Sequence, residues 1–314
     1  MTYGQIINSS ISHLFVDANS TGKGIRVTPN VRDGVTKTVY HDNCIYNTIG
    51  GFDMQGTVGN ETYRNSIRDI WMYNVVGSAS RAFNIYGSYN LMEGCEPAAC
   101  DGYGLFTSAT SLHVRGFFGD GEIRIDGANG TYENVGAESI HGSAPEDCVF
   151  RIAGQGNTFI NCNVTEVEAA TADYGFSLMA SGTTLIGCRQ FGTAYPRYML
   201  ISNASGAGTI IDFRGSSTFW TQLNNADFIA NWTCVGGVLQ RDGVSAQNGT
   251  GAATTFNIPH GLPAPPNKKR VCKVSAITQD IDYITADATN IIVEFESAPD
   301  VGTGNVIMDW WASL

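Results

Sequence analysis

Short runs in which apolar and polar residues alternate recur along the middle of the chain, and turns rich in Gly, Ser or Asn separate them. Four segments follow one scheme, an apolar-x-apolar pair, then a turn, then a second short apolar run: residues 82–95, 121–135, 148–162 and 174–188. Segments of this kind, repeating after roughly two dozen residues, predict a solenoid of short β-strands.

The four segments share a constant offset between two positions. In each segment the second apolar residue of the pair is followed, at the same distance along the chain, by the second repeated position. These pairs are Ile85 with Cys95, Ile125 with Val135, Ile152 with Cys162, and Leu178 with Cys188. A weaker copy at residues 104–117 aligns with Phe106 at the isoleucine position and Gly116 at the cysteine position. A drifted copy at residues 199–211 continues the series.

The spacing between copies varies from about 19 to about 27 residues. This range is too wide for a leucine-rich repeat but normal for a β-helix, in which the strands keep their length and the turns vary. With two or three strands per coil, successive coils stack at roughly 4.8 Å. The pattern therefore predicts an all-β chain wound as a parallel β-helix.

Stacking places equivalent positions of successive coils in columns. The isoleucine column is predicted to fill the interior, and the cysteine column, which holds small residues, to form a tight inner corner. A third apolar set lies three positions before the cysteine column: Met92, Tyr132, Phe159 and Leu185. Strict alternation cannot point both sets inward, so we expect a bend between them.

The chain has eight cysteines. Because those of the repeat are neighbours in one column, we interpret them as packed free thiols and not as disulfides. No CxxC pair is present, so the sequence predicts no zinc site, and it indicates no other cofactor.

Composition supports an all-β protein and narrows its partners. Of the 314 residues, 43% are hydrophobic, 15% are charged and 37 are glycine, a profile poor in helix formers. The formal net charge of −11, without any run of Lys or Arg, argues against nucleic acid as a partner. The start of the chain lacks the pattern of a signal peptide, and no apolar run is long enough to insert into a membrane. We therefore expect folding in a reducing cytoplasm.

The two ends differ from the middle. Residues 1–34 carry little repeat signal and are predicted to cap or lead into a β-helix at residues 35–241. From residue 242 the composition changes to a linker, a Pro-rich loop and strands at residues 270–299 and 305–314. These strands predict a second, small β-domain at residues 242–314.

The segments at residues 254–262 and 283–312 resemble the C-terminal β-domain of phage tailspikes and related pectate-lyase-like viral proteins, and the repeat resembles their body. The resemblance implies a right-handed single-stranded parallel β-helix followed by a small β-sandwich-like domain that assembles a homotrimer. It also implies a place in the virion tail, contacts with other phage tail proteins, folding in the host cytoplasm and action outside the cell. Such spikes usually begin with a virion-attachment domain, to which no segment of this sequence corresponds.

Trimerisation also has an argument from the residues. Open end strands invite edge pairing, which a closed symmetric oligomer prevents. The adjacent Trp310 and Trp311 near the end of the chain are costly to leave in water. One of them is expected in the core and the other at an interface.

The longest turns of the repeat are the strongest candidates for a glycan site, because turns and not strands build the groove of such a fold. They lie at residues 136–147 and 163–173, with residues 189–198 on the next coil. Their catalytic candidates are Glu138, Glu166, Glu168 and Asp173. Their substrate-binding candidates are His141, Arg189, Tyr195 and Arg197, joined by Arg151 on the adjoining strand.

Two chemistries fit this set. In a glycosidase, which we favour, Glu138 pairs with Glu166 or Glu168 as acid and as nucleophile or base. In a polysaccharide lyase, Arg189 and Arg197 neutralise a uronic carboxylate while His141 or Tyr195 removes a proton. The negative net charge weighs against a polyuronate. A non-catalytic receptor-binding spike and a secreted monomeric pectinolytic enzyme are further alternatives.

Other polar columns are weaker candidates. One strand face aligns Asn84, Arg124 and Arg151, and the positions beside them are Tyr86, Asp126 and Ala153; a cross-coil ion pair of Arg151 with Asp126 is the expectation there. Glu93 and Glu133 share a column that continues with isoleucines. His260 is predicted to be a structural turn residue.

Overall fold

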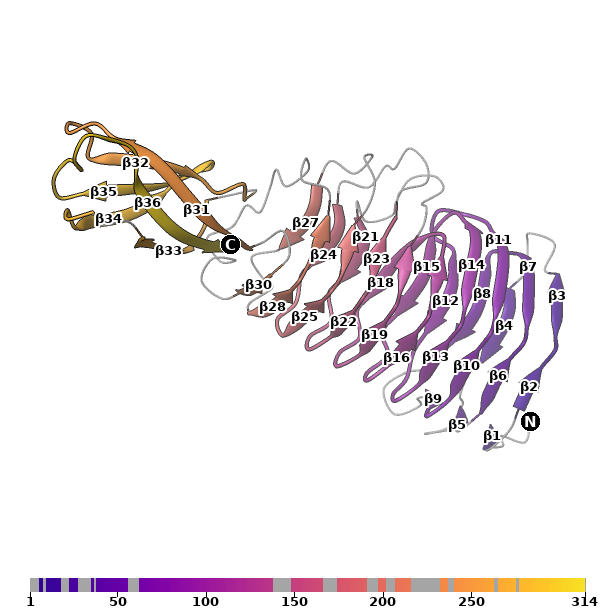
Figure 1. Cartoon of the computed structure of the whole chain (residues 1–314). Helices are drawn as coiled ribbons and strands as arrows, with labels where there is room; N and C mark the ends of the chain where they lie inside the picture. The colour runs from indigo at the N-terminus through magenta and orange to yellow at the C-terminus, as the bar shows by residue number, and fades with distance from the viewer. Residues whose placement is uncertain are drawn as a thin grey trace.

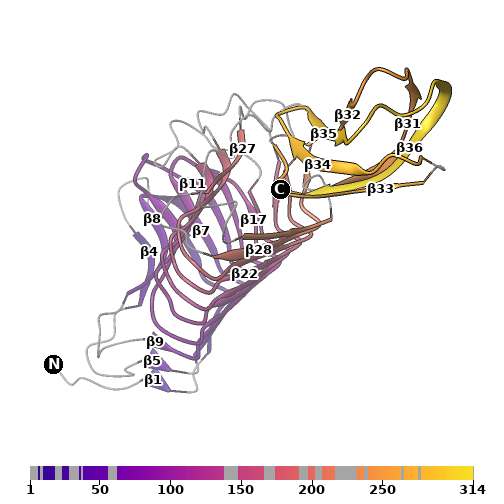
Figure 2. The same cartoon turned by 90° about the vertical axis from the view of Figure 1, so that its left-hand side faces the viewer.

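The computed structural model describes residues 6–7, 10–17, 23–27, 35–36, 38–55, 62–137, 148–165, 174–190, 197–201, 207–215, 232–236, 240–262, 265–274 and 277–313. Every regular secondary-structure element within these ranges is a β-strand. They form a long parallel β-solenoid that begins near the N-terminus and is followed at its far end by antiparallel strands (Figures 1 and 2). The predicted all-β parallel β-helix is confirmed.

Successive coils build the parallel sheets of the solenoid, and the longest sheet within the described ranges has ten strands. Their order is β2 (Ser10–Ser12), β6 (Val39–His41), β10 (Ser66–Arg68), β13 (Leu91–Glu93), β16 (His113–Arg115), β19 (Thr131–Glu133), β22 (Thr158–Ile160), β25 (Thr183–Ile186), β28 (Gly208–Ile211) and β30 (Trp232–Val235).

The second sheet has eight strands, and its outer face carries the candidate site described below. Their order is β4 (Lys23–Val27), β8 (Gly50–Met54), β12 (Arg81–Ile85), β15 (Tyr103–Thr107), β18 (Glu122–Ile125), β21 (Cys148–Ile152), β24 (Tyr174–Leu178) and β27 (Arg197–Ile201).

The third side is divided between two sheets. The first contains β3 (Phe15–Asp17), β7 (Cys44–Thr48), β11 (Trp71–Val75) and β14 (Glu96–Cys100). The second contains β17 (Phe118–Gly119), β20 (Gly136–Ala137), β23 (Asn163–Val164), β26 (Arg189–Gln190) and β29 (Arg214–Gly215). A small sheet near the N-terminus adds β1 (Ile6–Ile7), β5 (Val35–Thr36) and β9 (Thr62–Tyr63).

The C-terminal strands form two three-stranded antiparallel sheets. One has the order β31 (Gln240–Gly249), β36 (Gly302–Ser313) and β33 (Lys268–Lys273), and the other β32 (Thr255–Pro259), β35 (Asn290–Phe295) and β34 (Ile281–Ala286). Alternate residues of β35 and β36 are buried in a common apolar cluster, as in a sandwich. Trp310 is among them, whereas Trp311 is half-buried.

The segment before residue 35, predicted as a lead-in, already contributes to the solenoid. Strands β2, β3 and β4 pair in parallel with β6, β7 and β8 of the next coil. The winding of the chain therefore includes these residues, and the domain boundaries near residues 34 and 241 stay a prediction.

The interior column of the repeat is confirmed with one correction. Ile125, Ile152 and Leu178 are hydrogen-bonded neighbours in register, and all are fully buried. In the weaker copy, however, Thr107 and not Phe106 lies between Ile85 and Ile125. The register shifts by one residue between Tyr103 and Leu105, a bulge that the sequence alignment did not include.

The cysteine column needs the same one-residue correction. Phe117, not Gly116, stacks between Cys95 and Val135, because the N–H of Phe118 bonds the carbonyl of Cys95 and that of Gly136 the carbonyl of Phe117. Gly116 lies in the turn before it and has a φ of 61°. Equivalent turn residues also adopt positive φ: Gly94, Asn134, Asn161 and Gly187. This left-handed residue is the predicted bend, and Gly and Asn tolerate it best.

All eight cysteines are free thiols, as the sequence predicted. The three cysteines of the repeat column, Cys95, Cys162 and Cys188, are at most 1% exposed. Burial raises the pKa of the Cys95 thiol to about 12 and that of Cys162 well above its ordinary value. Cys95 and Cys162 are therefore packing residues and not nucleophiles.

A buried asparagine ties the turns of neighbouring coils together. The side chain of Asn157 accepts a hydrogen bond from the N–H of Gly130 at 2.7 Å. It donates to the carbonyls of Gly127 and Gly154 at 2.9 and 2.7 Å, and none of it is exposed. One side chain thus satisfies three backbone groups that water cannot reach.

We expect Asn157→Ala to lower the free energy of unfolding by about 3 kcal/mol, since each unsatisfied buried polar group costs roughly 1–3 kcal/mol. Urea titration followed by tryptophan fluorescence measures the effect. Asn257→Ala, on the exposed side of β32, is the control and should shift stability by no more than about 0.5 kcal/mol. Equal urea midpoints for the two variants would contradict the role given to Asn157.

Candidate functional site

The long turns chosen from the sequence connect the third side of the solenoid to the eight-stranded sheet. Their first residues follow β20, β23 and β26, which pair in register. Their last residues precede β21, β24 and β27, which also pair in register. The strands on both sides of each turn are therefore stacked on the equivalent strands of the next coil.

Most residues predicted for this site lie outside the described residues: Glu138, His141, Glu166, Glu168, Asp173 and Tyr195. The backbone of Arg197 belongs to β27, but its side chain is not among those described. Arg189 is exposed on β26, and in the sheet register it lies beside Asn163 of β23 and Arg214 of β29. The grouping of these acids and cations remains a prediction, supported by the stacked turn ends.

The outer face of the eight-stranded sheet carries the polar column predicted around Asn84. In the register of the sheet, Asn84 lies between Asp53 of the preceding coil and Phe106 of the next coil. Arg124 and Arg151 continue the column. Phe106, misplaced inward by the sequence alignment, is therefore a half-buried aromatic ring among polar neighbours.

Two contacts on this face differ in detail from the expected pattern. Asp126 accepts a hydrogen bond from Arg124 of its own coil, Nε to Oδ2 3.0 Å, a pair that the sequence analysis did not include. The Nε of Arg151 lies 3.2 Å from the sulfur of Met179 on the next coil. The outer face thus combines short-range ion pairs with half-buried guanidinium groups.

A cavity of about 240 Å³ opens on this face at the coils of β8 and β12. It is lined by Ile49, Gly50, Asp53, Gln55, Ala79, Arg81 and Asn84. The buried carboxylate of Asp53 accepts hydrogen bonds from Asn84 and Gln55, both at 2.7 Å. Arg26 from the preceding coil lies 3.7 Å from the same carboxylate.

The opposite wall of the cavity is held by Arg81. Its guanidinium carbon lies 3.5 Å from the ring centroid of Phe106, and its Nη1 donates to Asn84 at 3.1 Å. Tyr103 packs edge-on against the same ring. The cavity therefore presents a fixed cation, two amides and a carboxylate at once. The cavity could not be predicted from the sequence, because Asp53 and Arg81 belong to different coils and no local motif joins them.

The two glutamates that share a column, Glu93 and Glu133, do not face each other as an acid pair. Arg115 lies between them in register on β16. Its Nε is 3.1 Å from Glu133 and its Nη1 is 3.9 Å from Glu93. These side chains are about one third to one half exposed, so the ladder contributes little stability and offers no catalytic geometry.

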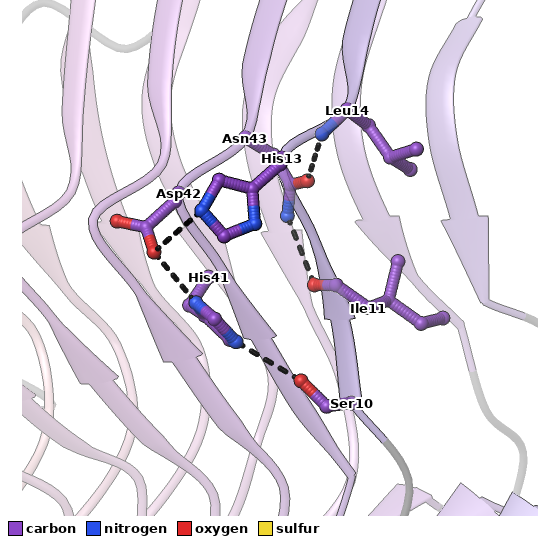
Figure 3. Close-up of polar contacts among 7 residues, drawn as sticks. All are labelled: Ser10, Ile11, His13, Leu14, His41, Asp42 and Asn43. Atoms are coloured by element: carbon purple, nitrogen blue, oxygen red, sulfur yellow. Dashed lines mark hydrogen bonds and ion pairs between the residues drawn. The ribbon is translucent and has the colours of Figure 1, made fainter.

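A further polar cluster lies on the ten-stranded sheet at the first coils (Figure 3). Ser10 Oγ is 2.9 Å from His41 Nε2, and His41 Nδ1 is 2.7 Å from the carboxylate of Asp42. Asn43 accepts from the N–H of Leu14 and donates to the carbonyl of Ile11, which joins the first two coils.

The order Ser, His, Asp in this cluster is that of a serine hydrolase, but a nucleophile of this type also needs N–H groups for the oxyanion. The turn N–H groups of Leu14 and Cys44 already bond Asn43 and Leu14. We therefore interpret the cluster as a connection between coils.

His260 is a structural turn residue, as predicted. Its side chain is 1% exposed, its Nε2 contacts the carbonyl of Asp287, and its Nδ1 accepts from the N–H of Leu262. Among the described residues there is no helix that could span a membrane, and no group of three or more His, Cys, Asp or Glu side chains that could hold a metal ion.

Neither a family model nor a curated protein matches the sequence. Solved structures do match the fold. The tailspike of Escherichia coli bacteriophage HK620, solved with a hexasaccharide, aligns with a TM-score of 0.53 and 10% identity over 98% of this chain and 69% of that chain. The chain has the fold of a phage tailspike.

Two other tailspikes match more loosely. That of Pseudomonas phage LKA1 has a TM-score of 0.43 and 12% identity, covering 98% of this chain and 66% of that one. That of Acinetobacter baumannii bacteriophage AP22, solved with capsular saccharide, has a TM-score of 0.40 and 9% identity, covering 98% and 60%. The chain spans only about two thirds of the length of these tailspikes, and its sequence identity to them is low. The likeness therefore extends to the fold alone.

Proposed function

We propose that this chain is the β-helical body of a phage tailspike that binds an extracellular or capsular polysaccharide along the outer face of its eight-stranded sheet. The observation that carries the proposal is the cavity between β8 and β12, in which amides, a carboxylate and a guanidinium converge. Such groups donate to and accept from sugar hydroxyls, and a concave site with a few fixed polar groups is the usual form of a ligand site. The tailspike of HK620, with the same fold, was solved with a hexasaccharide.

The bound polysaccharide runs from this cavity towards the long turns beside β21, β24 and β27. Arg151, half-buried on β21, lies between the two regions on the same face. A chain of several sugars is long enough to contact successive coils, because each coil advances by roughly 4.8 Å. The long turns then supply the reactive groups.

We propose that Glu138 and either Glu166 or Glu168, with Asp173 nearby, cleave the glycan as a glycosidase. The support is the register of the turn ends, which begin and end on neighbouring strands. A lyase that uses His141 or Tyr195 with Arg189 and Arg197 is the alternative, and a non-catalytic receptor-binding spike is another. In each case the protein works as a homotrimer in the virion tail beside other tail proteins, having folded in the host cytoplasm.

The proposal is tested by incubating the purified chain with a panel of capsular and exopolysaccharides, both neutral and acidic. We expect at least one to bind and to be shortened, with new reducing ends for a hydrolase and unsaturated uronate absorbance for a lyase. Binding without shortening would support the non-catalytic spike. Failure to bind any polysaccharide of a broad panel would refute the proposal.

A further inference from the structure

We infer that the cavity between β8 and β12 is a subsite for a carboxylate, so that the glycan of the proposed function, on which this inference rests, is an acidic one. The ligand class is a sugar that carries a carboxylate, as uronic acids do.

Arg81 is a cation without a carboxylate partner among the described residues. Its contacts are the amide oxygen of Asn84 and the ring of Phe106. Phe106 covers one face of the guanidinium and fixes its plane, while only one of the five N–H donors of an arginine is used by Asn84. The remaining donors form the fork that carboxylates bind in bidentate fashion.

The neighbouring charges do not remove this attraction. Asp53 is already bonded by Asn84 and Gln55 and lies beside Arg26, so its charge is largely compensated. Arg124 and Asp126 neutralise each other at 3.0 Å. Beside these, Arg26 and Arg151 lie on the same face, and the buried Glu122 shares the register column of Arg81 and Tyr103, so the described charges are four cations and three anions.

The negative net charge of the chain does not oppose an acidic ligand at this position. Exposed charges more than about 8 Å apart are screened at physiological salt. A ligand in the cavity therefore meets the half-buried Arg81 and the hydrogen-bonded Asp53, whereas the net charge of −11 acts mainly at low ionic strength.

The rest of the cavity suits a sugar and not a free inorganic anion. Ile49 and Ala79 are exposed apolar side chains at the rim that can pack against the C–H groups of a ring. The amide nitrogens of Gln55 and Asn84 each use one N–H on Asp53 and keep a second for a hydroxyl group, and the volume of about 240 Å³ exceeds what a small anion fills. A carboxylated pyranose offers a partner for each kind of group: a carboxylate for Arg81, hydroxyl groups for the amides and C–H groups for the apolar rim.

The test compares wild-type protein with Arg81→Gln, Arg81→Lys and a matched control, Arg68→Gln. Arg68 is an exposed arginine on the ten-stranded sheet, paired with Glu93. Binding to the polysaccharide panel is measured by calorimetry. The acidic polysaccharide that binds best is then measured again after its carboxylates have been reduced to primary alcohols.

We expect Arg81→Gln to weaken binding of the acidic polysaccharide by about 10- to 100-fold, the range for lost charge-assisted hydrogen bonds. Arg81→Lys should lose less, because it keeps the charge but not the fork. Reduction of the carboxylates should weaken wild-type binding to a similar extent and have little further effect on Arg81→Gln. Arg68→Gln should bind like wild type.

The inference is overturned if neutral polysaccharides bind as tightly as acidic ones, or if Arg81→Gln and Arg68→Gln bind the acidic ligand equally. Either result leaves the proposed function intact, since a glycan is still bound. Absence of binding to every polysaccharide instead removes the proposed function itself. A circular dichroism melt of each variant shows whether a loss reflects unfolding, and Arg81→Lys provides a second, gentler change at the same position.

Discussion

Replacing Glu138 and Glu166 together with glutamine is expected to lower polysaccharide turnover by about 10²- to 10⁴-fold, while the affinity for the polysaccharide changes by only a few-fold. Glutamine keeps the shape and hydrogen bonding of the side chain but cannot donate a proton as an acid or act as a nucleophile. Loss of turnover with retained binding would therefore identify these side chains as reacting groups. Reducing-end release gives turnover, and calorimetry on the same preparations gives affinity.

Three comparisons sharpen this experiment. Glu168→Gln in place of Glu166→Gln shows which glutamate completes the pair. Glu296→Gln, an exposed acid in the C-terminal domain, is the control and should retain full turnover. If Glu138→Gln, Glu166→Gln and Glu168→Gln each keep full turnover, the glycosidase proposal is wrong and the lyase residues His141 and Tyr195 become the next to test.

Phe159→Ala is expected to lower the free energy of unfolding by about 3–5 kcal/mol, as is usual for a buried phenylalanine in a rigid core. The ring of Phe159 stacks on that of Tyr132 from the preceding coil, with centroids 4.8 Å apart and planes 9° from parallel. Both side chains are fully buried. Removal of one ring leaves a void between coils whose backbones are held in register by the sheet, so the core cannot collapse to fill it.

Two variants next to Phe159 serve as controls in the same urea titration. Thr158→Ala changes the half-buried neighbour on the outer side of β22 and should cost at most about 1 kcal/mol. Tyr132→Phe keeps the stack and removes a buried hydroxyl that has no hydrogen-bond partner in the described structure, so it should not destabilise the protein. A loss of stability in Thr158→Ala as large as that in Phe159→Ala would show that the stacked core is not the source of the effect.

The part of the fold that could be predicted was the part that repeats. Ile125, Ile152 and Leu178 were assigned to one column because a β-helix gives every coil the same environment at the same position. The prediction shifted by one residue at Phe106 and Gly116. A bulge near Tyr103 adds a residue that periodicity alone does not reveal, and the apolar Phe106 matches an interior column better by residue type than the Thr107 that occupies it.

The candidate site was predicted less completely, and for a different reason. The long turns were recognised from their length, and the stacking of their ends follows from the repeat. The cavity was not recognised, since Asp53, Arg81 and Phe106 belong to three consecutive coils and each is unremarkable in its own segment. Their proximity depends on which face of the sheet each side chain occupies, and a slip of one residue reverses that face.

The sequence by itself determined that the chain is an all-β solenoid, that its cysteines are packed free thiols and that His260 belongs to a turn. These conclusions depend on local patterns, which backbone geometry and burial translate directly into structure. Only the tertiary structure decided that Phe106 faces outward under Arg81, and that Arg115 separates Glu93 from Glu133. Such contacts arise between coils, where the exact register of hydrogen bonds, and not the order of residues along the chain, brings side chains together.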